Sequence, residues 1–106
     1  MILFEESVTE SQAKVTLTTY GCEEHPGSSY FMTFSRDGGN LFFDYIGSDE
    51  IDYTEDEIKN SVEGLHSLPK SGLNMHIGHS ERSEEEAQKI VELLKSQWSV
   101  GVDYNP

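Results

Sequence analysis

The strongest constraint on the fold is a glycine-rich segment between two aromatic-rich runs. Residues 36–40 read Arg-Asp-Gly-Gly-Asn and separate the run 30–35 from the run 41–46. Glycine and asparagine tolerate the positive φ angles that tight turns need. The two runs are therefore predicted to form a β-hairpin.

Other segments extend this pattern to a whole domain. Alternating apolar residues predict strands over 14–20, 73–78 and 98–104, and the apolar start of the chain predicts an edge strand within residues 1–8. Capping boxes that begin at Thr54 and Ser83 predict two helices, the first of them limited by Pro69. The segment 73–104 is predicted to be a βαβ unit with parallel strands.

These elements predict one α+β domain over residues 1–106. Their order is roughly β-β-β-β-α-β-α-β, which favours a mostly antiparallel sheet with two helices on one face. Two amphipathic helices can cover one face of such a sheet, so the second face is expected to be open.

The charge balance decides which partners fit. The chain has 7 Lys and Arg against 20 Asp and Glu, a net charge of −13 with a pI of about 4.4. A phosphate backbone needs a basic face, so we expect no direct nucleic-acid binding and no binding to an anionic membrane. A basic protein is the partner that fits, although the same charge also suits a solubility device in high salt.

The acids are densest in one stretch. Residues 44–57 hold seven Asp and Glu and no Lys or Arg. Acids in the first turn of a helix complement its dipole, which gives part of this stretch a structural role. The remaining interpretation is an acidic surface that docks into a basic groove. The predicted partner-binding acids are Asp44, Asp49, Glu50, Asp52, Glu55 and Asp56.

The hairpin supplies a candidate apolar anchor. Both of its faces are partly aromatic, so one set of rings is expected to remain exposed unless loops cover it. Phe31 and Phe42 are the predicted anchor residues, with the alternate set of side chains left open.

No catalytic signature is present in the sequence. The alternative chemistry is a small metal-binding domain or metal-dependent enzyme that uses the Cys and His residues. Cys22 and His25 have the spacing of a metal-binding pair, and so do His76 and His79, but zinc normally needs three or four ligands. His66 is the remaining histidine of that alternative. We therefore expect no catalytic residues, no metal and no cofactor.

The single cysteine and the acidic start of the chain bear on compartment. Cys22 cannot form an intrachain disulfide, and residues 1–6 resemble neither a signal peptide nor a membrane span. The expected location is the cytoplasm.

Together these observations predict a non-enzymatic inhibitor of a basic partner, such as a nuclease toxin or a nucleic-acid-binding defence complex. In size and charge the chain is similar to small immunity proteins and to anti-restriction or anti-CRISPR proteins that mimic nucleic acid. No motif assigns it to a family. A self-associating scaffold component, for example a homodimer through an edge strand or the open face, is the other alternative.

Overall fold

The computed structural model describes residues 1–104, which form a six-stranded antiparallel sheet with helices on both faces. The strand order is β2-β3-β5-β1-β6-β4. The elements are β1 (Ile2–Phe4), α1 (Glu10–Tyr20), β2 (Met32–Arg36), β3 (Gly39–Ile46), the 3-10 helix η1 (Ser48–Glu50), α2 (Glu55–Ser61), β4 (Val62–Glu63), β5 (Ser71–Ile77), α3 (Glu81–Lys95) and β6 (Val100–Asp103). The α+β class is therefore confirmed.

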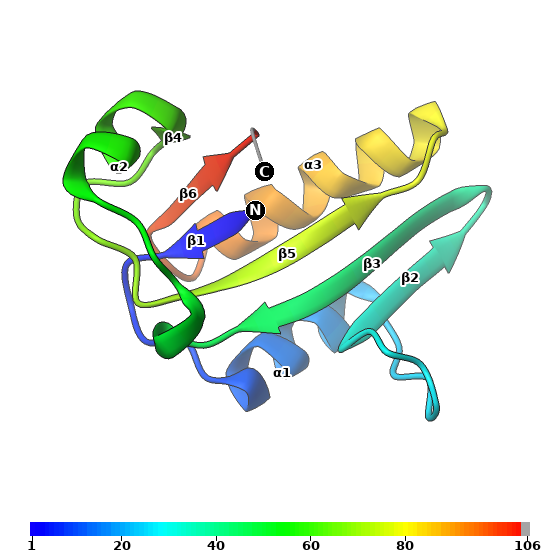
Figure 1. Cartoon of the computed structure of the whole chain (residues 1–106). Coiled ribbons are helices and arrows are strands. Elements are labelled where there is room, and N and C mark those ends of the chain that lie inside the picture. The colour runs from blue at the N-terminus through cyan, green and yellow to red at the C-terminus, as the bar shows by residue number, and fades with distance from the viewer. Residues whose placement is uncertain (105–106) are drawn as a thin grey trace.

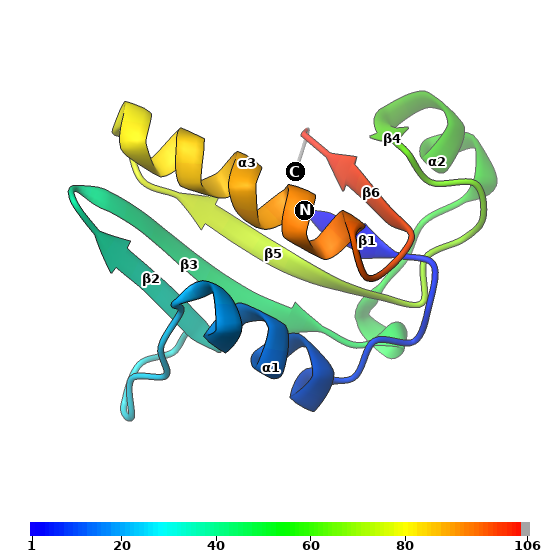
Figure 2. The same cartoon turned by 180° about the vertical axis from the view of Figure 1, so that it is seen from behind.

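Helices α1 and α3 cover one face of the sheet, which we call the helical face (Figure 2). The main core lies between them and the strands. Its largest fully buried side chains include Phe4, Leu17, Phe43, Ile90 and Leu94. Burial of side chains of this size contributes roughly 1.5–3 kcal/mol each, so this layer supplies most of the driving force for folding.

The predicted hairpin is confirmed. Strands β2 and β3 pair from Met32 opposite Phe43 to Arg36 opposite Gly39. Asp37 and Gly38 form the turn with positive φ angles of 51° and 84°. Asparagine, aspartate and glycine are the residues that adopt this conformation most readily, which explains why the sequence predicted the turn correctly.

The predicted strand at 14–20 is wrong, because this segment belongs to helix α1. Thr9 caps the helix in a capping box with Gln12, and Gly21 ends it with a φ of 118°. The buried residues Ala13, Thr16 and Leu17 follow helical spacing. Val15, which the alternating pattern placed beside Leu17, is 67% exposed.

The first strand is central and not at an edge. β1 pairs antiparallel with both β5 and β6. The parallel orientation predicted for the strands of the 73–104 unit is confirmed, but β1 lies between them. The elements β1, α1, β3, β5, α3 and β6 thus have the βαββαβ order of the ferredoxin-like, or split βαβ, arrangement.

The helix boundaries also differ from the prediction in two places. The N-cap of α3 is Ser80 and not Ser83, and the Ser80 hydroxyl accepts a hydrogen bond from the Ser83 amide at 3.1 Å. Thr54 caps α2 as predicted, but that helix ends at Ser61 and Val62 enters β4. None of the helices in the described chain has the length and apolar character needed to cross a bilayer.

Candidate functional site

The sheet face opposite α1 and α3 is covered over only half of its width. Leu3 of β1 points to this second face and packs with Ile58, Val62 and Leu65 in a smaller core. The segment that contains α2 therefore covers the β1–β6–β4 half. Within residues 1–104, no helix lies over the second face of β2, β3 and β5 (Figure 1).

We call this uncovered half the open face. Its position follows from strand alternation, because Leu41, Phe43 and Leu73 point into the main core and their neighbours point away. The side chains on the open face include Tyr30, Thr33, Phe42, Asp44, Asn74 and His76.

Three aromatic rings form a cluster on the open face. Phe42 and His76 are directly opposite in the β3–β5 ladder. The ring of Tyr30 lies 5.1 Å from that of Phe42 and 5.6 Å from that of His76, between ring centroids. These distances are typical of aromatic pairs, so the three rings support one another in a half-exposed patch.

A carboxylate borders this aromatic cluster. The Nε2 atom of His76 lies 3.2 Å from Oδ2 of Asp44, and the two side chains are 46% and 37% exposed. The Asn74 amide nitrogen lies 3.4 Å from the same His76 atom. In the described chain no serine, threonine or cysteine side chain hydrogen-bonds to His76, so this pair lacks the nucleophile of a catalytic triad.

The acids that follow β3 form a second feature, which we call the acidic segment. All of its members are exposed: Asp49 and Glu50 in η1, Asp52, and Glu55 and Asp56 in the first turn of α2. Within residues 1–104, four cations form ion pairs (Lys14, Arg82, Lys89 and Lys95), and their partners are acids elsewhere in the chain: Glu24, Asp37, Glu85, Glu86 and Glu92. No ion pair to Lys or Arg therefore compensates the charge of the acidic segment within these residues.

The two features are connected along the chain. The acidic segment begins directly after β3, and Ile51 and Tyr53 within the same stretch pack on the core that covers the adjoining half of the sheet. Figure 1 shows η1 beyond the C-terminal end of β3, and α2 at the opposite edge of the sheet, next to β4. The acidic segment therefore continues from the strand that carries Phe42 and Asp44 of the open face.

The predicted anchor residues do not lie together. Phe42 is on the open face, but Phe31 turns to the helical face, where its ring lies 6.0 Å from that of Tyr45 and 5.6 Å from Nζ of Lys14. Regular alternation fails at Phe31 because β2 begins only at Met32. The sequence interpretation missed Tyr30 and His76, although the His76 position in an alternating strand was a usable signal.

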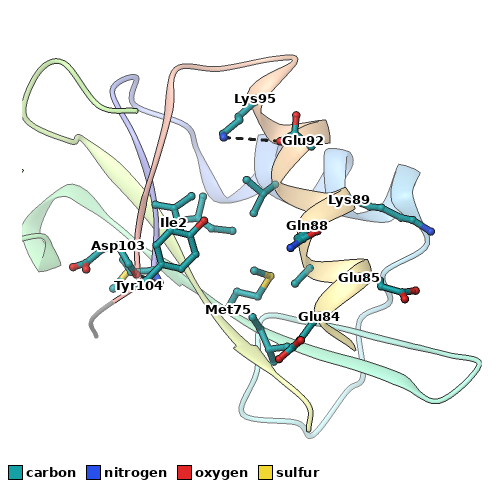
Figure 3. A pocket seen from close by; sticks show the side chains of 15 residues that line it. Ile2, Met75, Glu84, Glu85, Gln88, Lys89, Glu92, Lys95, Asp103 and Tyr104 are labelled. Carbon is teal, nitrogen blue, oxygen red and sulfur yellow. Dashed lines mark hydrogen bonds and ion pairs between the residues drawn. The ribbon is translucent and has the colours of Figure 1, made fainter. Parts of the chain in front are cut away.

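A groove beside α3 is a separate concave surface (Figure 3). It has a volume of about 1060 Å³, and Ile2, Met75, Val91 and Val102 contribute apolar lining. Its charged residues have both signs: Glu84, Glu85, Glu92 and Asp103 with Lys89 and Lys95. This groove lies on the helical side of the sheet, away from the aromatic cluster.

The structure gives the metal alternative little support. No group of three or more His, Cys, Asp or Glu side chains within residues 1–104 is placed to hold a metal ion. Cys22 is buried, and burial raises the pKa of its thiol to about 12, which disfavours the thiolate that metals and electrophiles require. His25 is paired instead with Glu23, at 3.7 Å.

Comparison with known proteins adds no identity. No family model, curated protein or solved structure matches this chain.

Proposed function

We propose that this protein is a non-enzymatic binding protein that docks on a basic protein and neutralises it. The observation that carries the proposal is an open sheet face whose strand β3 leads directly into an acidic segment that has no ion-pair partners in the described chain. Apolar patches bordered by charge are typical of protein interfaces. A net charge of −13 then selects a positively charged partner.

The partner class follows from the charge pattern. Neighbouring carboxylates on strand and helix surfaces lie roughly 5–7 Å apart, which resembles the spacing of successive phosphates in a nucleic-acid strand. A groove that binds nucleic acid has the complementary basic surface. We therefore favour a nuclease toxin or a nucleic-acid-binding complex as the target, with inhibition by occupation of its basic groove.

The edges of the sheet favour this reading over self-association through strand pairing. Glu23 and Thr33 exchange two backbone hydrogen bonds, of 2.8 and 2.9 Å, on the outer side of β2. The opposite edge strand, β4, spans only Val62 and Glu63. Short or blocked edges are the usual protection against edge-to-edge pairing.

The first test is capture of the partner. The tagged protein is incubated with a nuclease-treated host lysate and washed at low and then at high salt, and bound proteins are identified by mass spectrometry. A stoichiometric basic protein that leaves at high salt is the expected result. A clean lane, together with a dimer in light scattering, would contradict the proposal and favour self-association.

The second test measures the contribution of the acidic segment to association with the captured partner. The variant carries Asp49→Asn, Glu50→Gln and Asp52→Asn. At 0.1 M salt, two charges about 10 Å apart in water interact by roughly 0.15 kcal/mol. Three acids that each face about three basic groups thus contribute roughly 1.4 kcal/mol, or about tenfold in the association rate.

A matched control removes the same charge from the other side of the molecule. Glu10→Gln, Glu81→Gln and Glu92→Gln change three exposed acids on the helices of the helical face. Stopped-flow or surface-plasmon kinetics should show a much smaller loss for this control. Equal association rates for the two triple variants would refute the role of the acidic segment.

A further inference from the structure

The open face has a composition that selects one kind of side chain. Three rings and one carboxylate converge there, and the strands beneath contribute a single cation. That cation, Arg36, lies on the helical face, with its guanidinium 5.7 Å from the ring of Phe34. The surface is therefore aromatic and acidic, with no lysine or arginine of the three strands on it.

A second acid, Glu23, extends the acidic and aromatic surface to the edge of the sheet. Glu23 bridges Thr33, Thr33 is opposite Phe42, and Phe42 is opposite His76. Residues directly opposite in an antiparallel ladder point to the same face, so one row across three strands begins with a carboxylate and ends beside another. The side chain of Glu23 is 75% exposed, with His25 as its neighbour.

We propose that the open face binds an arginine side chain of the partner, stacked on the Tyr30–Phe42–His76 cluster and paired with Asp44. A guanidinium is planar, so it stacks on aromatic rings while its N–H groups donate to a carboxylate at the edge of the stack. In the described contacts, His76 meets the Asp44 carboxylate at Oδ2, which leaves Oδ1 to accept from the arginine. This inference rests on the proposed function and names the chemistry of the contact.

The charge pattern separates arginine from a nucleobase. Some βαββαβ domains stack bases on aromatic side chains of an open sheet. A stacked nucleotide carries a phosphate, which here would lie near Asp44 and Glu23 with no Lys or Arg on the open face. An aliphatic side chain would fill the patch but leave Asp44 unused. Lysine can place its charge over a ring or near Asp44, but the planar guanidinium of arginine stacks on the rings and donates to the carboxylate at the same time.

The test compares two peptides of equal charge, penta-arginine and penta-lysine, by NMR titration of the ¹⁵N-labelled full chain. The expected result is a Kd about fivefold lower for penta-arginine, the ratio that stacking at an exposed site supports. The amide signals of Phe42, Asp44 and His76 should shift most. Equal affinities, or shifts confined to the acidic segment, would overturn the proposal.

Variants assign the preference to the cluster. Phe42→Leu should remove the preference for arginine, and Tyr30→Leu provides the same test from a loop position if the first variant folds poorly. Tyr104→Leu is the matched control, because Tyr104 is 72% exposed but borders the groove beside α3. Loss of the preference in the control, or its retention in both cluster variants, would contradict the assignment.

Two further measurements separate this inference from its alternatives. Binding of an oligouridylate at the open face would overturn it in favour of a nucleobase site. If a basic partner is captured from lysate but neither peptide shows an arginine preference, the arginine site fails and the proposed function stands. If the preference is present but no basic partner is captured, the arginine site stands and the proposed function fails.

Discussion

Replacement of Glu86 by glutamine provides a sharp test of how the fold uses its acids. The Glu86 side chain is only 5% exposed, yet it accepts a hydrogen bond from the Tyr20 hydroxyl, which joins α3 to α1. Its Oε1 atom lies 3.0 Å from Nη2 of Arg82 and 3.5 Å from Nζ of Lys89. The Tyr20 hydrogen bond, with help from the two cations, lowers the pKa of Glu86 against the opposing effect of burial.

The loss of folding stability expected for Glu86→Gln follows from these contacts. Glutamine keeps the volume and still accepts from Tyr20, but loses the charge assistance, which is worth about 1 kcal/mol. The ion pair with Arg82, whose side chain is 38% exposed, adds only about 0.5 kcal/mol after solvent screening. Glu86→Gln should therefore destabilise the protein by about 1.5 kcal/mol and lower Tm by about 7 °C.

Urea unfolding followed by Trp98 fluorescence measures this change, since Trp98 packs edge-on against Phe4 with a centroid distance of 5.4 Å. A double-mutant cycle with Tyr20→Phe should give a coupling of about 1 kcal/mol. Glu85→Gln is the control, because Glu85 is 60% exposed and should cost less than about 0.5 kcal/mol.

The direction in which stability changes with pH is an independent test of the role of Glu86. Because the pKa of Glu86 is lowered in the folded state, its stabilisation is complete above its unfolded pKa and is lost as pH falls through the folded value. The difference between wild type and Glu86→Gln should therefore shrink in acid. A variant as stable as wild type at neutral pH, or a cycle without coupling, would refute the reasoning.

Two other outcomes follow from titratable groups that are partly or fully buried, Tyr53 and Cys22. Burial and a hydrogen bond to Asp103 raise the pKa of Tyr53 to about 12. Because only the unfolded phenol ionises between about pH 10 and 12, the free energy of unfolding should fall over this range. Urea unfolding of Tyr53→Phe should show a smaller fall, and an unchanged pH profile would contradict this prediction. Burial raises the pKa of the Cys22 thiol to about 12. At about pH 8 the thiol should therefore react with an aromatic disulfide reagent on the order of 10³ times more slowly than in the unfolded chain. Comparable rates in the folded and unfolded chain would show that the thiol is accessible.

The hairpin and the capping signal at Thr54 were predictable because they depend on local backbone chemistry. Helix α1 was not predicted because its threonines have a high strand propensity and its apolar residues alternate over four positions by chance. The signals that would have found it are the Thr9–Gln12 box and Gly21, whose φ of 118° ends the helix. Tertiary packing of Ala13 and Leu17 on the core then overrides propensity.

The central position of β1 could not be read from periodicity. Its partners β5 and β6 lie far from it in the sequence, and pairing between such distant segments leaves no local sequence pattern. The same limit applies to the open face. Phe42 was predicted, but its contact with Tyr30 depends on a loop, and its position opposite His76 depends on the β3–β5 register.

The distribution of acids distinguishes those that stabilise the fold from those that are proposed to bind a partner. Like charges that repel one another reduce the stability of a compact state, so a domain that needs only to remain dissolved gains nothing from concentrating them. In α3 the acids have a structural use, since Glu86 is paired and Glu85 contacts Arg82. In the acidic segment no acid forms an ion pair with Lys or Arg within residues 1–104, although Lys59 lies on the same short helix. A basic partner would supply the missing charges, and the stability lost to repulsion in the free protein would then be recovered as affinity.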